Sequence, residues 1–240
     1  MKENFDFNDI SIFDLANNHH GSLDHALKIV REIGGIVEKY AVRGVFKFQF
    51  RQLNTFIHPA HRIGSKNKHI PRFISTRLER KDFEVLLDAL REKNMLGMCT
   101  PFDEESVDVI AQMGFDLIKV ASSSAKDWPL LEKIADAGLP IIFSTGGLSI
   151  GDIDNLVSFF THRGSEFAIM HCVSLCPIPI ERFQLNQIEV LRNRYPDHVI
   201  GWSTHEDPDE TVPIQIAVAK GARIFERHVG IATTHFNFAS

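Results

Sequence analysis

The sequence predicts a (βα)8 TIM barrel formed by one domain that covers residues 1–240. Two observations predict this fold. Short apolar runs alternate with longer amphipathic stretches, which is typical of βα units repeated around a parallel sheet. Eight such runs occur, whereas an open doubly wound sheet usually has fewer strands and a glycine-rich fingerprint after the first, and no GxGxxG motif is present.

Length, composition and charge limit the classes of function. The chain has 240 residues, 44% of them apolar, which is enough for one substantial core. Its formal net charge of −5 provides no global attraction to nucleic acid or anionic membranes, so an anionic ligand needs local cations. No apolar run approaches the roughly 20 residues of a membrane span. We expect a cytoplasmic protein with no nucleic-acid or membrane partner.

The strands are predicted from runs that are short, apolar and rich in β-branched or aromatic residues. Side chains alternate along a strand, and in a barrel one of the two faces points inward. In chain order the predicted strands are Ser11–Ala16, Val45–Phe50, Met95–Thr100, Leu117–Ser122, Pro140–Thr145, Phe167–Val173, Val199–His205 and Ala222–Val229.

The helices are predicted from apolar residues that recur at helical spacing between successive strands. They are Asp24–Tyr40, Arg80–Lys93, Glu104–Met113, Pro129–Ala137, Gly151–Thr161, Asn186–Tyr195 and Glu210–Lys220. Only residues 231–240 follow the last strand, so we expect the final helix of the barrel to be missing and the chain to be truncated at its C-terminal end. The longest connection, Arg51–Thr76, is expected to be either a lid or a plain solvated loop.

Polar residues occur near the C-terminal end of every predicted strand, which is where barrel enzymes carry their active sites. Counting back in steps of two from each of them gives one candidate inward face per strand. The polar members of these faces are Asp14, Lys47, Gln49, Thr100, Lys119, Ser144, His171, Ser203, His205, Glu226 and His228. Buried lysines and carboxylates are costly unless they are paired or used, so their repetition favours a site over packing.

The lysines and histidines indicate two kinds of chemistry. Lys47 and Lys119, with nearby hydroxyl groups, would bind a small dianion such as a phosphate ester. An alternative is that each lysine forms a buried ion pair with Asp14 or Glu226. His205 and His228 end adjacent strands and could hold one divalent cation, leaving positions for substrate and water. For His171 a core histidine with a satisfied hydrogen bond is the simpler interpretation.

Eight motifs in this order resemble the N-acetylneuraminate (sialic acid) synthases and their relatives among the spore-coat polysaccharide biosynthesis proteins. The motifs are Ala16–Gly21, Lys47–Gln49, Cys99–Asp103, Lys119–Ser122, Ser144–Gly146, His171–Cys172, Gly201–His205 and Phe225–His228. The resemblance implies a metal-dependent barrel enzyme, with Mn²⁺ or Mg²⁺ as the metal. It would condense phosphoenolpyruvate with an N-acylated amino-sugar aldehyde and water, giving a nine-carbon 2-keto sugar acid and phosphate for surface polysaccharide biosynthesis.

The resemblance also implies roles for individual residues. It assigns catalysis to Asp14, metal binding to His205 and His228, and sugar binding to Asn18, Gln49 and Ser174. Phosphoenolpyruvate would be held by Lys47, Thr100, Lys119, Ser122, Ser144 and Ser203. A homodimer is expected as well.

The chain departs from the family pattern at several positions. Asp14 stands where the family usually has glutamate, which shortens the side chain by one methylene. Ser124, Ser174 and Cys176 replace a glutamate, an asparagine and an aromatic residue on the sugar side. The C-terminal antifreeze-like domain of the sialic acid synthases, which crosses to the partner subunit, has no counterpart here. These changes point to an acceptor other than N-acetylmannosamine itself.

Two further hypotheses stay open. The first is another metal-dependent aldolase or a 2-keto-3-deoxy sugar-acid synthase that uses the same anion pocket. A phosphorylated acceptor would then need a second basic cluster, for which Lys66, Lys68 and Arg72 are the candidates. The second is a barrel that has lost catalysis and serves as a binding or assembly module, which the shortened Asp14 would favour.

Overall fold

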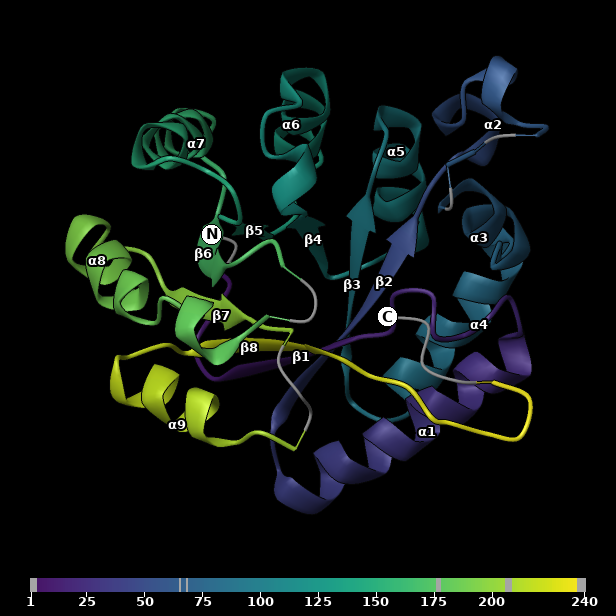
Figure 1. The fold of residues 1–240 in the computed structure, drawn as a ribbon, viewed down its shortest axis with the longest axis horizontal. Helices are drawn as coiled ribbons and strands as arrows, with labels where there is room; N and C mark the ends of the chain where they lie inside the picture. Colours follow the sequence, from purple (N-terminus) through teal and green to yellow (C-terminus); the bar gives the residue numbers. More distant parts are fainter. Residues whose placement is uncertain (1–3, 65, 68, 176–177, 206–208, 237–240) are drawn as a thin grey trace. The chain divides into compact units, whose positions relative to one another are not determined.

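The strands of the computed structural model are hydrogen-bonded in the order β1 to β8 and close into a barrel. The structure describes residues 4–64, 66–67, 69–175, 178–205 and 209–236, and eight strands lie in these residues. They are β1 (Ile10–Asp14), β2 (Arg43–Phe50), β3 (Leu96–Pro101), β4 (Leu117–Val120), β5 (Ile141–Ser144), β6 (Phe167–Cys172), β7 (Ile200–Ser203) and β8 (Ile224–His228) (Figure 1). Each overlaps a predicted strand, so the predicted TIM barrel is confirmed.

The helices of the described residues include all seven predicted ones. Those are α1 (Leu23–Tyr40), α4 (Arg80–Arg91), α5 (Glu104–Met113), α6 (Trp128–Asp136), α7 (Ile150–His162), α8 (Asn186–Arg194) and α9 (Val212–Ala219). No helix follows β8 in residues 229–236. None of the described helices is long and apolar enough to cross a membrane.

The connection from Arg51 to Thr76 is more ordered than either interpretation of the sequence predicted. It contains α2 (Leu53–Phe56), α3 (His69–Ser75) and a 3₁₀ turn at Pro59–His61. The sequence analysis predicted no helices here because α2 and α3 are too short to show a periodic apolar stripe, and α3 carries Pro71 in its first turn, where proline is tolerated. Whether the connection acts as a lid stays a prediction. Lys68, one of the candidate basic residues, lies outside the described residues.

The chain divides into two compact units, each with its own part of the sheet. The first comprises Met1–Ile12 and Asp116–Arg227, and the second Phe13–Phe115 and His228–Ser240. In the second unit, β2 pairs in parallel with β3 so that Lys47 lies opposite Met98 and Gln49 opposite Thr100. These four residues share one face, as the alternation predicted.

In helix α1 of this second unit, individual residues determine where the helix begins, which face is buried and where it ends. The hydroxyl of Ser22 accepts the backbone N–H of His25 at 3.2 Å and caps the first turn. Ala26, Ile29, Val30 and Val37 are buried along one stripe. The helix ends at Ala41, which adopts a left-handed conformation with φ 49°.

The parallel pairing in the first unit corrects the predicted inward face of β6. Ser144 lies opposite Met170, Cys172 lies opposite Ser203, and Ser203 lies opposite Glu226. Cys172 therefore shares the face of Ser203 and Glu226, whereas His171 points to the other side with Trp202. The prediction that placed Ile169, His171 and Val173 on the inward face was wrong.

Candidate functional site

A triad of Asp14, Lys47 and His228 lies in the second unit, with Asp14 and Lys47 buried and His228 partly exposed. Asp14 ends β1, Lys47 lies in β2 and His228 ends β8. Lys47 Nζ is 2.9 Å from Asp14 Oδ2, and both side chains are almost fully buried. The other carboxylate oxygen, Oδ1, accepts the backbone N–H of Ala16 at 3.0 Å. The ion pair that the sequence left open as an alternative for Lys47 is thus present, and it fixes the orientation of the Asp14 carboxylate.

His228, one of the two predicted metal ligands, lies beside the Asp14 carboxylate. Its Nδ1 lies 3.3 Å from Asp14 Oδ2. A histidine whose one ring nitrogen is held by a carboxylate presents the other nitrogen to a cation, as in many metal sites. Imidazole nitrogen and carboxylate oxygen both suit Mn²⁺, so the residues present fit such an ion.

The second predicted ligand, His205, belongs to the other unit, so its meeting with His228 at one cation stays a prediction. Among the residues that the structure describes, no three histidine, cysteine, aspartate or glutamate side chains are grouped so as to hold a metal ion. A site with two protein ligands would leave most coordination positions to substrate and water.

A second polar cluster lies in the first unit and is centred on Lys119. Lys119 Nζ donates to Ser144 Oγ at 2.7 Å and forms an ion pair with Glu226 Oε2 at 3.0 Å. Ser203 Oγ donates to Glu226 Oε1 at 2.9 Å. All four side chains are buried, and they come from β4, β5, β7 and β8. Lys119 and Ser203, two of the predicted phosphoenolpyruvate-binding residues, therefore contact Glu226, and a third, Ser144, contacts Lys119.

The turn after β5 brings Ser122 and Ser174 against Gly146. Ser122 Oγ accepts the backbone N–H of Gly146 at 2.9 Å. A Cβ at Gly146 would overlap Ser174 Oγ and lie 2.8 Å from Ser122 Oγ, so only glycine leaves room for both hydroxyl groups. Ser174 also lines a cavity of about 440 Å³ beside α7 and α8. Ser122 and Ser174, one assigned to phosphoenolpyruvate and one to sugar, thus lie close together.

Cys172 is a site residue that the sequence analysis missed. It takes hydrogen bonds from Ser122 and Ser203, and burial raises the pKa of its thiol. Cys99 and Cys172 are both free thiols, and Cys176 lies outside the described residues. His171, by contrast, is bonded through Nε2 to the carbonyl of Phe183 at 2.9 Å, and burial lowers its pKa. The interpretation of His171 as a satisfied core histidine is confirmed.

The remaining predicted residues lie in the second unit. Thr100 is buried, and its Oγ1 has no hydrogen-bond partner among the described residues. Gln49 Oε1 accepts a hydrogen bond from Arg51 Nη2 at 2.7 Å. Asn18 Nδ2 donates to the carbonyl of Val229 at 2.8 Å, which ties the loop after β1 to the segment after β8.

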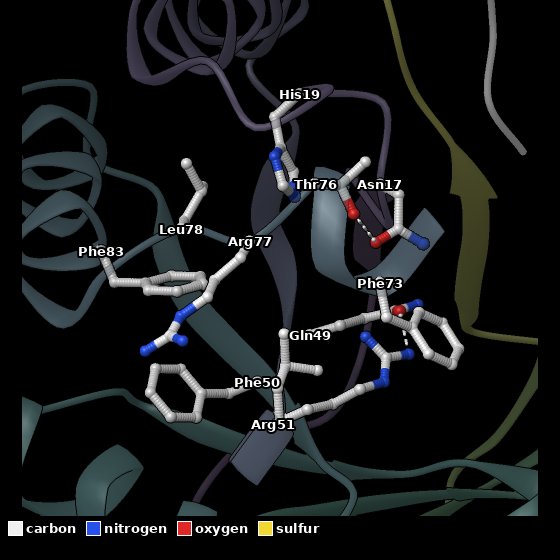
Figure 2. A pocket seen from close by; sticks show the side chains of 11 residues that line it. Asn17, His19, Gln49, Phe50, Arg51, Phe73, Thr76, Arg77, Leu78 and Phe83 are labelled. Atoms are coloured by element: carbon white, nitrogen blue, oxygen red, sulfur yellow. Dashed lines mark hydrogen bonds between the residues drawn. The ribbon is translucent and has the colours of Figure 1, made fainter. Parts of the chain in front are cut away.

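Gln49 also lines a small cavity of about 40 Å³ that the sequence analysis did not anticipate (Figure 2). Its polar lining residues are Asn17, His19, Gln49, Arg51, Thr76 and Arg77. Arg51 follows Gln49 by two residues, so the same alternation that selected Lys47 and Gln49 would have found it. The prediction stopped at Phe50 because that residue ends the apolar run.

Comparison with known proteins identifies the family of this chain. Residues 39–235 match the NeuB family. The chain is 30% identical over 218 residues to the uncharacterized protein MJ1065 of Methanocaldococcus jannaschii, covering 88% of this chain and 59% of that protein. It therefore spans less than two thirds of the length of this curated relative.

Two solved structures are similar over nearly the whole chain. A Chromobacterium violaceum protein assigned as spore coat polysaccharide biosynthesis protein E is 43% identical, with a TM-score of 0.92 and coverage of 95% of this chain and 68% of that one. The N-acetylneuraminic acid synthetase of Leptospira borgpetersenii, in complex with citrate, is 30% identical, with a TM-score of 0.82 and coverage of 94% and 74%. On the strength of the matched residues, the barrel and these relatives, the chain belongs to the NeuB family.

Proposed function

We propose that this chain is the barrel part of a synthase that condenses phosphoenolpyruvate with an N-acylated amino-sugar aldehyde and water. The products are a nine-carbon 2-keto sugar acid and inorganic phosphate, as expected for a relative of an N-acetylneuraminic acid synthetase. The observation that carries the proposal is the buried contact of Lys119 with Ser144 and Glu226. In this proposal residues 1–240 act as one catalytic domain, in the cytoplasm and as a homodimer.

The Lys119 cluster supports the binding of a phosphorylated anion. An ammonium group has three donors, and two of them reach Ser144 and Glu226. The ammonium group and the serine hydroxyl groups, which can rotate, are the kind of donors that an oxyanion accepts from. Glu226 holds Lys119 in place before the ligand arrives, which reduces the entropy lost on binding. Ser122, Ser203 and Thr100 complete the proposed donor set with Lys47.

Asp14 is proposed to act as the general base that accepts a proton from the reacting water. The methylene carbon of phosphoenolpyruvate forms the new C–C bond to the aldehyde carbon, and the aldehyde oxygen takes up a proton to become a hydroxyl group. Water then adds to the electron-poor carbon that carries the phosphate ester, and one of its protons passes to the Asp14 carboxylate. The C–O bond to phosphate breaks, phosphate leaves with the remaining hydroxyl proton, and the carbon becomes the ketone of the product. The Oδ2 atom that accepts the proton from water is the one next to Lys47 and His228. A divalent cation bound at His228 and His205 would supply a Lewis acid that polarises the aldehyde oxygen.

The experiment that tests this function is an assay of acceptor-dependent phosphate release. Purified protein is incubated with phosphoenolpyruvate, Mn²⁺ and a panel of 2-acetamido sugars. We expect phosphate only when an acceptor is present, and we expect Lys119→Met to abolish it. Lys126→Met is the matched control, because Lys126 is an exposed lysine of the same unit that pairs with Asp152.

The outcome also separates the competing hypotheses. Phosphoenolpyruvate binding without release for any acceptor would contradict the proposal and favour the non-catalytic module. Release only with phosphorylated or carboxylated acceptors would favour the related 2-keto-3-deoxy sugar-acid synthase.

A further inference from the structure

Asn18 lies in the loop after β1, and it is almost completely buried, with 2% of its surface exposed. Its Nδ2 donates to the carbonyl oxygen of Val229 at 2.8 Å. Val229 directly follows His228, the predicted metal ligand that ends β8. The amide of Asn18 therefore holds the main chain next to a proposed ligand.

Both polar groups of the Val229 main chain are engaged by residues of β1 and the loop after it. The N–H of Val229 donates to the carbonyl oxygen of Asp14 at 2.9 Å, and its carbonyl oxygen accepts the amide of Asn18. The carboxylate of the same Asp14 lies 3.3 Å from His228 Nδ1. Asp14 and Asn18 thus hold the ring of His228 and the main chain that follows it at the same time.

The loop that carries Asn18 is itself held in one conformation. The N–H of Asn18 closes a turn by donating to the carbonyl oxygen of Leu15 at 2.9 Å. Ala16 has a positive φ of 45°, which is costly for a residue other than glycine and persists only where the surroundings enforce it. Asn17 Oδ1 accepts a hydrogen bond from Thr76 Oγ1 at 3.2 Å, which attaches the loop to the residue after α3 (Figure 2). An ordered loop presents the Asn18 amide in a single orientation.

The segment after β8 has a second attachment at Phe236. The ring of Phe236 stacks on His20 with 4.9 Å between the ring centres, and its centre lies 4.6 Å from that of His25 in α1. A turn supports this position, since the N–H of Thr233 donates to the carbonyl oxygen of Phe236 at 2.7 Å. These contacts fix the far end of the segment, whereas Asn18 acts directly beside His228.

The contacts of Asn18 favour a role other than the sugar binding that the resemblance implies. A residue that binds a sugar directly must offer it polar atoms at an accessible surface. Asn18 has almost no exposed surface, and one donor of its amide is used by Val229. Its position is that of a residue that orients a metal ligand through the main chain.

We propose that Asn18 is a positioning residue for the metal site: its hydrogen bond to Val229 fixes the main chain after β8 and thereby the direction of the His228 imidazole. The inference rests on the proposed function, in which His228 binds Mn²⁺ or Mg²⁺. Hydrogen-bond partners of metal ligands that do not touch the metal themselves typically change metal affinity by about 10–100-fold when they are removed. Asn18 acts through the neighbouring residue, so its effect should lie at the lower end of this range.

Titration of the full chain with Mn²⁺, followed by the electron paramagnetic resonance signal of the free ion, tests this inference without turnover. Asn18→Leu keeps the volume of the side chain and removes its amide. We expect this variant to raise the Kd for Mn²⁺ by about tenfold. Asn18→Gln retains a donating amide and should recover part of the affinity. Circular dichroism during urea denaturation shows whether each variant is folded.

The KM for the acceptor separates positioning from direct sugar contact. It is measured at saturating Mn²⁺ with the 2-acetamido sugar that supports phosphate release. Positioning of His228 predicts that Asn18→Leu has the acceptor KM of the wild type once the metal site is filled. A raised acceptor KM together with an unchanged Kd for Mn²⁺ would show that Asn18 contacts the sugar, and it would overturn the inference.

Two matched controls accompany these variants. Asn54→Leu makes the same change at an exposed asparagine of the same unit, and it should leave the Kd for Mn²⁺ unchanged. Phe236→Ala removes the stacking at the far end of the segment after β8. It should also leave the Kd unchanged, because Val229 keeps its hydrogen bonds with Asp14 and Asn18.

The outcomes for the inference and for the function are distinct. An unchanged Kd for Mn²⁺ in Asn18→Leu, or an equal loss of affinity in Phe236→Ala, would overturn the inference even if the wild type released phosphate. Weaker Mn²⁺ binding in Asn18→Leu alone, without phosphate release by the wild type for any acceptor, would support the inference and count against the synthase function. No Mn²⁺ binding by the wild type would overturn both the inference and the predicted metal site.

Discussion

Lys119 and Glu226 form a buried ion pair, with Nζ 3.0 Å from Oε2, and two serine hydroxyls complete their hydrogen bonds. Removing one member of such a pair leaves a charge without its partner in a medium that solvates it poorly. A substitution of either residue is therefore expected to alter the proposed phosphoenolpyruvate site and to destabilise the fold.

Glu226→Ala is expected to lower the free energy of unfolding by about 3–5 kcal/mol because it leaves Lys119 buried and uncompensated. Urea denaturation followed by circular dichroism measures this change. Glu189→Ala, which breaks the exposed pair with Lys220, should cost only about 0–1 kcal/mol. Equal losses for the two variants would contradict the burial argument.

His228→Ala is expected to lower the affinity for Mn²⁺, because it removes the imidazole that Asp14 orients. Metal content after dialysis against Mn²⁺ gives the stoichiometry independently of turnover. His235→Ala, in an exposed position of the same unit, is the control and should retain the metal. Unchanged stoichiometry in His228→Ala would refute the predicted metal site.

Gly146→Ala is expected to lower the affinity for phosphoenolpyruvate by about tenfold, or roughly 1.4 kcal/mol, because a Cβ displaces the side chains of Ser122 and Ser174. Fluorescence or calorimetric titration measures the affinity. The double variant Gly146→Ala/Ser174→Ala lacks Ser174 Oγ, the atom closest to the new Cβ, and should recover part of the lost affinity. Gly151→Ala, where a Cβ would lie 3.8 Å from Ser149 Oγ, should bind phosphoenolpyruvate normally.

The lowered pKa of His19 predicts that the stability of the fold depends on pH. Its pKa is about 4 in the folded chain against 6.5 for an unperturbed histidine, so the unfolded state binds the proton more readily. The free energy of unfolding should therefore be at its full value above pH 6.5 and fall as the pH drops towards 4, by up to roughly 3 kcal/mol from this residue. Denaturation of His19→Gln at several pH values should show a shallower decline. The exposed His61→Gln should follow the wild type.

Much of the fold could be predicted because apolar periodicity determines where strands and helices lie. Helix Glu104–Met113 was predicted with its observed bounds, and the eight strands were found within a few residues. Several strand ends, such as that at His205, were predicted too far along the chain, because polar residues that follow a strand belong to the loop once they leave the hydrogen-bonded ladder. Short helices such as α3 leave no periodic signal.

The candidate site was predicted less completely, for two physical reasons. The inward face of β6 was assigned from its most polar residue, but the strand register places Cys172 opposite Ser203, and His171 satisfies its hydrogen bond at Phe183. Which partner a buried lysine takes also depends on strand pairing over more than a hundred residues, as for Lys119 and Glu226. Side-chain alternation limits these choices without deciding them.

The position of Cys172 has a consequence for chemical reactivity. A thiol beside a lysine is often activated as a thiolate, but here burial outweighs Lys119, and Glu226 adds to the effect, so the pKa is raised. At neutral pH the sulfur therefore stays protonated and is a poor nucleophile towards peroxide or iodoacetamide. At Cys172 the proposed phosphoenolpyruvate site is in this way resistant to oxidation and alkylation.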